Sequence, residues 1–418
     1  YAADGENGVV STGLDVLCVS ETVHDRFARN RALVAFYDVG LMVTDNGGAG
    51  WRRCVSGIPK PWSGTCFSVA QSTVDSNRWW AVFGRWGAKS QGLPAVSEDG
   101  GCSWKLLQDA TGWTDAKAGQ MRVLPGDPEI LAVVHERDGL LLSRDGARTW
   151  TRPSSESFPD SERCTALGTA NGCLFAGTKG RKGMSPQLWR SDDRGVSWRK
   201  VWDAPGEAEG EVTSIAATNG RIVFCVKCCG AKGGCWLSKD DGKAWRRIYR
   251  ESSWNDLNAV AIAGDEIVLA SRNARWHDDG FGGRGLLSSA DDGRTWRRHE
   301  EGGFDRPEIM NLAVNPFCPS EVWVGTWGNS LAILNLADDV RKSETARIQG
   351  EIDRAAAQGG GRVVLSRGIH PCGTLYLKSG VELHLEEGAV LLGGGRSEDY
   401  DDAIPLREVY SYANSHSN

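Results

Sequence analysis

The eight residues Ser191-Asp192-Asp193-Arg194-Gly195-Val196-Ser197-Trp198 are the clearest copy of a phrase that the chain repeats six times. The pattern Ser-x-Asp-x-Gly-x-Ser/Thr-Trp predicts a tight turn between two strands. A short Asp side chain can accept hydrogen bonds from the amides of its own turn, and Gly adopts backbone angles that other residues resist. The closing Trp is expected to anchor the next strand in the core.

The six copies end at nearly evenly spaced tryptophans, Trp51, Trp104, Trp150, Trp198, Trp245 and Trp296. Successive ones are 53, 46, 48, 47 and 51 positions apart. A repeat of roughly 40 to 50 residues made of short strands is typical of a β-propeller with one four-stranded blade per repeat. Six repeats give six complete blades, and three further strand patterns between 310 and 334 indicate a seventh. Residues near Val9 and Val10 are expected to supply its fourth strand, so the sequence predicts an all-β, seven-bladed propeller.

The repeated phrase resembles the Asp box, or BNR repeat, of sialidases, family 74 xyloglucanases, sortilin-like receptors and photosystem assembly factors. Four copies keep Ser, Asp, Gly and Trp in register. The first copy has Thr44 and Asn46 in the Ser and Asp places, and the third has Ala147 in the Gly place. In those families the box is structural. The resemblance therefore implies that the box Asp residues stabilise turns and are not catalytic.

Composition narrows the classes of function. The 418 residues include 18 Trp and 53 Gly but only four Met, and their formal net charge is -6. That charge argues against a nucleic-acid groove, which needs a basic patch. No stretch reaches the roughly 20 apolar residues of a membrane span. We expect an extracellular or periplasmic protein that needs no cofactor.

Most of the 12 Cys residues lie singly in strand patterns, as small buried residues do. The exception is a cluster with the spacing Cys225-x-x-Cys228-Cys229-x5-Cys235. A zinc site at this spacing would need a second Cys or His pair, which does not follow. We therefore expect no metal here, and either a hairpin disulfide or plain thiols.

The repeats end at about residue 336, and the character of the chain changes from about Glu344. Ile348, Ile352, Ala355 and Ala356 share one face of a predicted helix that Gly359 to Gly361 ends. Short strands follow at 363–365, 375–377, 381–385 and 390–392. This tail, with Gly359-Gly360-Gly361-Arg362-Val363 and Leu377-Lys378-Ser379-Gly380-Val381, resembles the N-terminus of family 28 polygalacturonases.

The resemblance covers about 60 residues and implies the start of a right-handed, pectin-lyase-like parallel β-helix behind a capping helix. The predicted domains are thus 1–336, a propeller, and 337–418, a truncated β-helix. Those enzymes carry their catalytic residues on later coils, which this chain lacks, so we expect it to be part of a longer polypeptide.

Strand direction separates the loops of a propeller. In an antiparallel blade the first and third turns share one face, which carries the boxes, and the second turns and the links between blades share the other. Six tryptophans outside the boxes map to this second face: Trp62, Trp86, Trp113, Trp254, Trp276 and Trp327. With Arg272 they are the predicted substrate-binding residues, because flat rings beside polar groups suit sugars. The alternative is that several pack between blades.

Asp38 is the first candidate for catalysis. The segment Tyr37-Asp38-Val39-Gly40 resembles the Asp-Val-Gly-Gly segment that carries a catalytic Asp in family 74 xyloglucanases, although Leu41 replaces the second Gly. A glycosidase needs two carboxylates, about 5 to 9.5 Å apart. The candidate partners are Asp115, Asp256 and Asp278. The alternative for Asp38 is a structural cap of its loop.

These observations predict a secreted, glycoside hydrolase-like protein whose propeller binds, and in one version hydrolyses, a polysaccharide. The second hypothesis is a non-catalytic propeller that holds a glycan or a protein for a β-helix enzyme. The third is a sialidase, which would require three converging Arg residues such as Arg85, Arg272 and Arg306.

Overall fold

The computed structural model describes residues 2–4, 8–10, 17–85, 91–205, 210–218, 220–229, 233–250, 254–255, 257–271, 285–299, 308–366 and 368–393. The chain forms two compact units, Tyr1–Leu334 and Asn335–Asn418. The sequence analysis placed the border two residues later, after 336. Each unit is described by itself.

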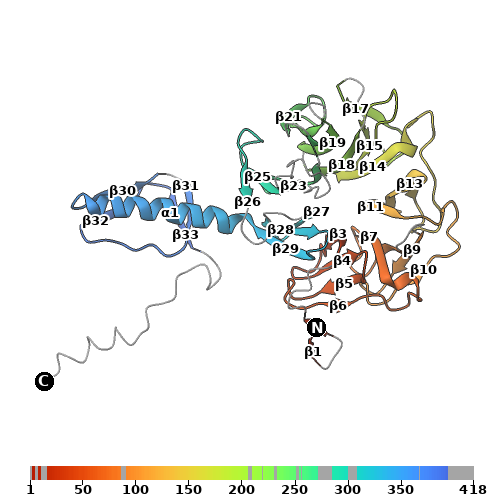
Figure 1. Ribbon diagram of the computed structural model, residues 1–418, viewed down its shortest axis with the longest axis horizontal. Helices are drawn as coiled ribbons and strands as arrows, with labels where there is room; N and C mark the ends of the chain where they lie inside the picture. Colours follow the sequence, from red (N-terminus) through yellow and green to blue (C-terminus); the bar gives the residue numbers. More distant parts are fainter. Residues whose placement is uncertain are drawn as a thin grey trace. The chain divides into compact units, whose positions relative to one another are not determined.

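The first unit is a ring of antiparallel sheets (Figure 1). Five blades of this ring have four strands each. These are β3–β6 (Val19–His24, Ala32–Phe36, Gly40–Thr44, Arg52–Arg53), β7–β10 (Thr65–Gln71, Trp79–Arg85, Gln91–Ser97, Lys105–Leu106), β14–β17 (Cys164–Ala170, Cys173–Thr178, Gln187–Ser191, Arg199–Asp203), β18–β21 (Gly210–Ala217, Ile222–Cys229, Gly234–Ser238, Arg246–Tyr249) and β23–β26 (Leu257–Ala263, Glu266–Ser271, Leu286–Ser289, Arg297–His299). One parallel pair, Gly40 with Thr65, joins the first two into a continuous eight-stranded sheet.

Two sheets of the ring have three strands. They are β11–β13 (Ala118–Leu124, Ile130–His135, Gly139–Ser143) and β27–β29 (Ile309–Asn315, Cys318–Thr326, Leu331–Asn335). The prediction of seven four-stranded blades is therefore wrong in number, since five are complete in the described part of the chain. In the β11–β13 sheet the fourth strand shrinks to one bridge between Leu142 and Thr151, and Pro153 follows, which cannot donate to a ladder.

The N-terminal residues do not complete the β27–β29 sheet. β1 (Ala2–Asp4) and β2 (Gly8–Val10) pair with each other as a two-stranded sheet. Directly after β29, helix α1 begins at Leu336 in the place where the other blades have a box turn. The expected closing strand near Val9 and Val10 is thus a wrong prediction.

Between neighbouring sheets lies the core of this unit, built from alternate strand residues and box tryptophans. Trp104 and Trp150 are each nearly fully buried. The box turns have the expected geometry. In the best copy Asp193 Oδ1 accepts hydrogen bonds from Ser191 Oγ and from the Ser197 amide, both at 2.8 Å, and Gly195 has a φ of 83°. The box carboxylates are therefore used within their own turns.

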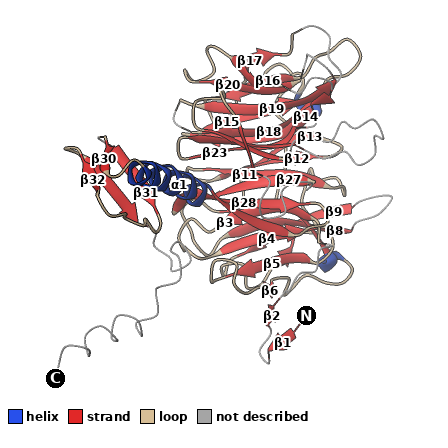
Figure 2. Cartoon of the chain, turned by 60° about the vertical axis from the view of Figure 1, so that its left-hand side comes forward, coloured by secondary structure: helices blue, strands red, loops and turns tan. Residues whose placement is uncertain are grey.

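The second unit consists of α1 (Leu336–Ala357) and four strands (Figure 2). β30 (Gly361–Leu365) pairs in parallel with β32 (Val381–Leu385), and β31 (Gly368–Cys372) pairs in parallel with β33 (Ala389–Gly393). Ile348 and Ile352 of α1 share a small core with Val363, Leu365 and Cys372.

The predicted helix is confirmed, although it starts earlier than expected. The expected strand at 375–377 is irregular chain, and β31 was not foreseen. None of the helices in the described part of the chain combines the length and apolar character needed to span a membrane.

Candidate functional site

The two faces of the ring carry different loops. We use "box face" for the face with the six repeated turns, and "front face" for the opposite face. The front face holds the β4–β5 turn at 37–39 and the 3-10 helix Trp62–Gly64 that leads into β7. It also holds the end of β8, the start of β9 and the link at 107–117.

Four side chains on the front of the β7–β10 blade lie in contact, and we name them the front cluster: Trp62, Arg85, Gln91 and Asp115. The Arg85 guanidinium lies 5.7 Å from the centroid of the Trp62 ring. Arg85 Nη1 donates to Gln91 Oε1 at 3.4 Å, and Gln91 Nε2 donates to Asp115 Oδ2 at 2.5 Å. Arg85 is exposed and the other three are half-buried. The structure thus brings together two predicted site residues, Trp62 and Asp115, through Gln91, which the sequence analysis did not name, and Arg85, which it named only for the sialidase hypothesis.

Asp115 also fixes the backbone beside it. Its Oδ1 accepts a hydrogen bond from the Gly92 amide at 3.0 Å, and Gly92 is buried. With one oxygen on Gly92 and the other on Gln91, the carboxylate joins the link at 107–117 to the start of β9. These two hydrogen bonds give the Asp115 carboxylate a structural role.

Asp38 lies in the β4–β5 turn with an exposed side chain. Its Oδ2 accepts a hydrogen bond from the Cys18 amide at 2.9 Å. Burial, together with the nearby Asp38 charge, raises the pKa of the Cys18 thiol to about 11. Gly40 is required here, because its φ is 82° and a Cβ would lie 2.4 Å from the Ser63 carbonyl oxygen. The Asp-x-Gly pattern therefore has a complete structural explanation in this turn.

Two further predicted tryptophans are half-buried in the packing between sheets. Trp113 Nε1 donates to the Gly92 carbonyl at 2.7 Å, and its ring lies 4.9 Å from that of His135. Trp327 packs 5.3 Å from Tyr37, whose ring also contacts Phe67 at 5.9 Å and the Lys117 ammonium at 5.3 Å from the ring centroid. Both indoles thus follow the packing alternative, leaving part of each ring exposed.

The remaining predicted residues are only partly described. Trp254 belongs to the short strand β22 (Trp254–Asn255), which pairs with β19 opposite Cys229. Trp86, Trp276, Arg272, Arg306, Asp256 and Asp278 lie outside the described residues. In the cysteine cluster, Cys225 and Cys235 are direct partners across β19 and β20, both fully buried thiols.

Sequence reasoning missed Gln91 and Lys117. Gln91 is the first residue of β9, and Lys117 directly precedes β11. These positions follow only once strand boundaries are known. It also missed the central channel, a cavity of about 650 Å³ lined by β3, β11, β14, β18, β23 and β27. Inside it, Arg122 Nη1 lies 2.6 Å from Glu21 Oε1. Burial raises the pKa of the Glu21 carboxyl, and the Arg122 charge partly offsets that rise.

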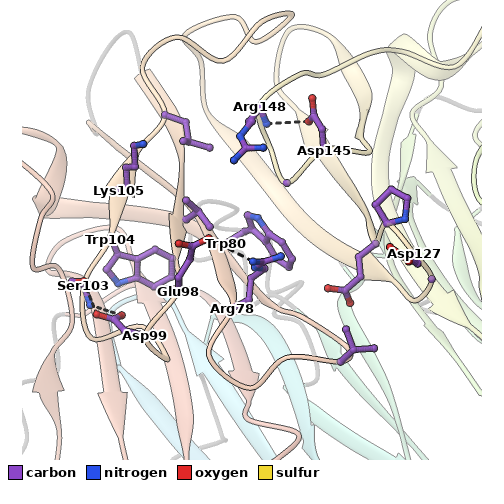
Figure 3. Close-up of a pocket in the computed structure, with 17 residues that line it drawn as sticks. Arg78, Trp80, Glu98, Asp99, Ser103, Trp104, Lys105, Asp127, Asp145 and Arg148 are labelled. Carbon is purple, nitrogen blue, oxygen red and sulfur yellow. Dashed lines mark hydrogen bonds and ion pairs between the residues drawn. The ribbon is translucent and has the colours of Figure 1, made fainter.

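A second cavity, of about 680 Å³, opens on the box face between the β7–β10 blade and the β11–β13 sheet (Figure 3). We name it the box-face groove. Its lining includes Trp80, Trp104, Arg78, Glu98 and Arg148. None of these residues was a predicted site residue.

No family model matches the chain. Among curated proteins, xyloglucanase Xgh74A of Acetivibrio thermocellus is 23% identical over 300 residues, covering 59% of this chain and 34% of the relative. The chain thus spans about a third of the length of that relative.

Solved structures resemble the ring. The GH74 xyloglucanase of Xanthomonas campestris has a TM-score of 0.61 at 15% identity and is matched over 78% of this chain and 53% of its own. YCF48 from Cyanidioschyzon merolae has a TM-score of 0.57 at 12% identity, over 78% of this chain and 98% of its own. The first unit is therefore a β-propeller similar to those of family 74 xyloglucanases. A pectin-lyase-like β-helix is not shown by any of these similarities.

Proposed function

We propose that this chain is a glycoside hydrolase-like, carbohydrate-active protein whose propeller binds a polysaccharide at the front face. The observation that carries the proposal is the front cluster, an aromatic ring in contact with a line of hydrogen-bonding groups. Its support comes from the similarity to family 74 xyloglucanases in both sequence and fold.

The groups of the front cluster suit a sugar. An aromatic ring and a planar guanidinium offer flat surfaces to the C–H face of a pyranose, and side-chain amides and carboxylates can bond its hydroxyl groups. Arg85 is exposed beside Trp62, so its guanidinium is accessible to a ligand. Gln91 and Asp115 are already held by neighbours, which lowers the entropy lost on binding.

Binding is better supported than hydrolysis by the described residues. Hydrolysis of a glycoside needs two carboxyl groups at a set separation. Asp38 and Asp115 each hold backbone amides, as a structural carboxylate does. Hydrolysis remains the finer hypothesis, with Asp38, Asp115 and Asp256 as candidate acids and Asp256 outside the described part of the chain.

The second unit and the location belong to the same proposal. We infer that residues 337–418 begin a parallel β-helix, because the paired strands are offset by about one coil: Gly361 pairs with Val381, and Gly368 with Ala389. A helix packed on the first coil, as α1 packs here, fits a capping role. Extracellular or periplasmic residence would bring such a protein to its polysaccharide.

A protein-binding propeller is the second candidate function. One observation favours it: the chain covers 98% of the solved structure titled "YCF48 bound to D1 peptide", with a TM-score of 0.54 and 14% identity. Nearly the whole of that peptide-bound protein is thus matched by this chain. The sialidase hypothesis has less support, because Arg85 is engaged with Trp62 and Gln91.

Binding of xyloglucan oligosaccharides, measured by calorimetry, tests the proposal. Arg85→Ala and Gln91→Ala should each weaken binding about tenfold, equivalent to about 1.4 kcal/mol. The matched control is Arg199→Ala, an exposed arginine on β17 that pairs with Asp192, and it should leave binding unchanged. Absence of binding by the wild-type chain, or equal effects of all three variants, would refute the front-face proposal. Hydrolysis assays of Asp38→Asn separate the finer hypothesis, because unchanged hydrolysis would remove Asp38 from the mechanism.

A further inference from the structure

Cys225 on β19 and Cys235 on β20 lie directly opposite each other in the β18–β21 blade. They are register partners in an antiparallel pair whose register is regular throughout. Residues opposite each other in such a pair have Cα atoms about 4.5 to 5.5 Å apart, and disulfides join Cα atoms about 4.4 to 6.8 Å apart. The strand pairing thus already holds the two residues at a separation that a disulfide can span. We propose that Cys225 and Cys235 form a cross-strand disulfide.

The two side chains lie on the same face of the blade. Both cysteines belong to one hydrophobic cluster with Leu269 and Leu287 of the β23–β26 blade. Phe224, the neighbour of Cys225, belongs to the cluster on the other face, as the alternation of side chains along a strand requires. Both thiols are 0% exposed. Their surroundings are apolar, and a disulfide, which has no S–H donor to satisfy, suits such a site.

The register selects this pair among the cysteines of the described strands. No other two of them are direct partners in a described strand pair or bridge. Cys66 lies opposite Phe83, for example, and Cys228 lies opposite Gly210. The sequence pattern left a hairpin disulfide and plain thiols as equal alternatives for the cysteine cluster. The strand pairing favours the disulfide and identifies its two ends.

The bond forms by thiol–disulfide exchange with a small disulfide such as oxidised glutathione. One cysteine thiolate attacks that disulfide, releases one glutathione and forms a mixed disulfide. The second cysteine then attacks the protein sulfur, forms the Cys225–Cys235 bond and releases the other glutathione. Two electrons thus pass from the two cysteines to the oxidant, and the two thiol protons end on the two glutathione molecules.

Burial requires this exchange to precede the closure of the blade. Neither thiol is accessible in the folded ring. Burial, together with the neighbouring Cys235, raises the pKa of the Cys225 thiol well above its usual value. Because the thiolate is the nucleophile, the folded, reduced chain should not react. The disulfide is therefore acquired during folding, which an oxidising compartment such as the proposed extracellular or periplasmic one permits.

The disulfide supports a strand that leads to a predicted site residue. β19 continues from Cys225 to Cys229, which is the register partner of Trp254 on β22. A covalent link between β19 and β20 limits the ways in which this hairpin can open and restricts the unfolded chain. The inference does not rest on polysaccharide binding, because it requires only the register and the burial of the two cysteines.

The test compares two preparations of the full chain, both unfolded, reduced and then refolded. One is refolded with oxidised and reduced glutathione, and the other with a reductant alone. Remaining thiols are alkylated, and the peptides of a digest are mapped by mass spectrometry. We expect a Cys225–Cys235 crosslink in most molecules of the first preparation and in none of the second. The inference is overturned if the first preparation lacks this crosslink, or if Cys225 is joined to Cys228 or Cys229 instead.

Two further measurements test its consequences. Oxidised glutathione added to the folded, reduced chain should produce no crosslink, and a crosslink there would contradict formation during folding. The oxidised chain should unfold at a temperature at least about 2 °C above that of the reduced chain.

The difference in unfolding temperature should vanish in Cys235→Ala and persist in Cys66→Ala, which removes a single buried cysteine. If it persists in Cys235→Ala, another disulfide causes it and the inference fails. The peptide map uses the wild-type chain, so it decides the question even where a variant does not fold.

Discussion

Carboxylates on the two faces of the propeller bind backbone amides over very different chain separations. On the box face, Asp193 accepts from the Ser197 amide, four positions away, and from the Ser191 hydroxyl, two positions away. On the front face, Asp38 accepts from Cys18, 20 positions away, and Asp115 from Gly92, 23 positions away. The box turns are therefore locally self-sufficient, whereas the front turns depend on segments that reach them from elsewhere in the fold. Hydrogen bonds within one short turn can recur as a repeated sequence pattern. A hydrogen bond between distant segments leaves no such pattern.

The largest expected effect comes from adding a methyl group to one glycine on each face. Gly40→Ala forces a left-handed backbone on Ala and pushes its Cβ to 2.4 Å from the Ser63 carbonyl oxygen. Gly146, in a box turn, has a similar φ of 74° but no atom within 4 Å of the added Cβ. We expect losses in the free energy of unfolding of about 3 kcal/mol for Gly40→Ala and about 1 kcal/mol for Gly146→Ala. Urea unfolding measures both, and equal losses would contradict a long-range constraint on the front turn.

The second prediction removes one carboxylate from each face. Asp115→Ala leaves the buried Gly92 amide without its acceptor, at a cost of about 2 kcal/mol. Asp99→Ala removes the acceptor of the Ser97 hydroxyl and of the Ser103 amide. Water can replace it at the exposed Ser103, and the buried Ser97 Oγ still accepts from the Gly101 amide. Its expected cost is about 1 kcal/mol. A box variant that destabilises more than the front variant would reverse the comparison.

The same contrast decides what could be predicted from the sequence. The box turns, the propeller and the helix before the second set of strands all rest on local patterns, and the structure has them. The predicted number of complete blades was wrong because that number depends on two single features. These are Pro153 after one box and the helix that begins at Leu336 after β29. Residue type alone indicated Trp62 and Asp115. Their contact through Arg85 and Gln91 could not be predicted, since it requires the register of β8 and β9.

The third prediction distinguishes a structural Asp38 from a catalytic one. Asn keeps an oxygen that can accept from the Cys18 amide, whereas Ala removes it. We expect Asp38→Asn to change the free energy of unfolding by less than about 0.5 kcal/mol and Asp38→Ala to lower it by about 1 kcal/mol. Thermal and urea unfolding of both variants provide the measurement. If Asp38→Ala unfolds as the wild type does, the hydrogen bond to Cys18 contributes nothing, and the structural account of this residue fails.

The smallest effect concerns the charge of the box carboxylates. Backbone hydrogen bonds, first from Thr295, lower the pKa of Asp291 to about 2. Its folded pKa therefore lies below the value of about 3.9 expected in the unfolded chain. A group of this kind adds stability above about pH 4, and that contribution is lost as the pH falls toward 2. Asp291→Asn should consequently show a smaller drop in the urea midpoint between pH 4 and pH 2 than the wild type.

The first box supplies the reverse experiment, because Asn46 already occupies the Asp place and accepts the Gly50 amide at 2.8 Å. Asn46→Asp introduces a carboxylate into the same set of donors. The pH dependence of stability between pH 4 and pH 2 should then increase, opposite in sign to the change in Asp291→Asn. If both substitutions leave that dependence unchanged, the turns are held by the geometry of the acceptor oxygen alone. The charge would then have no part in the box, and the two faces would differ only in the chain separation of their hydrogen bonds.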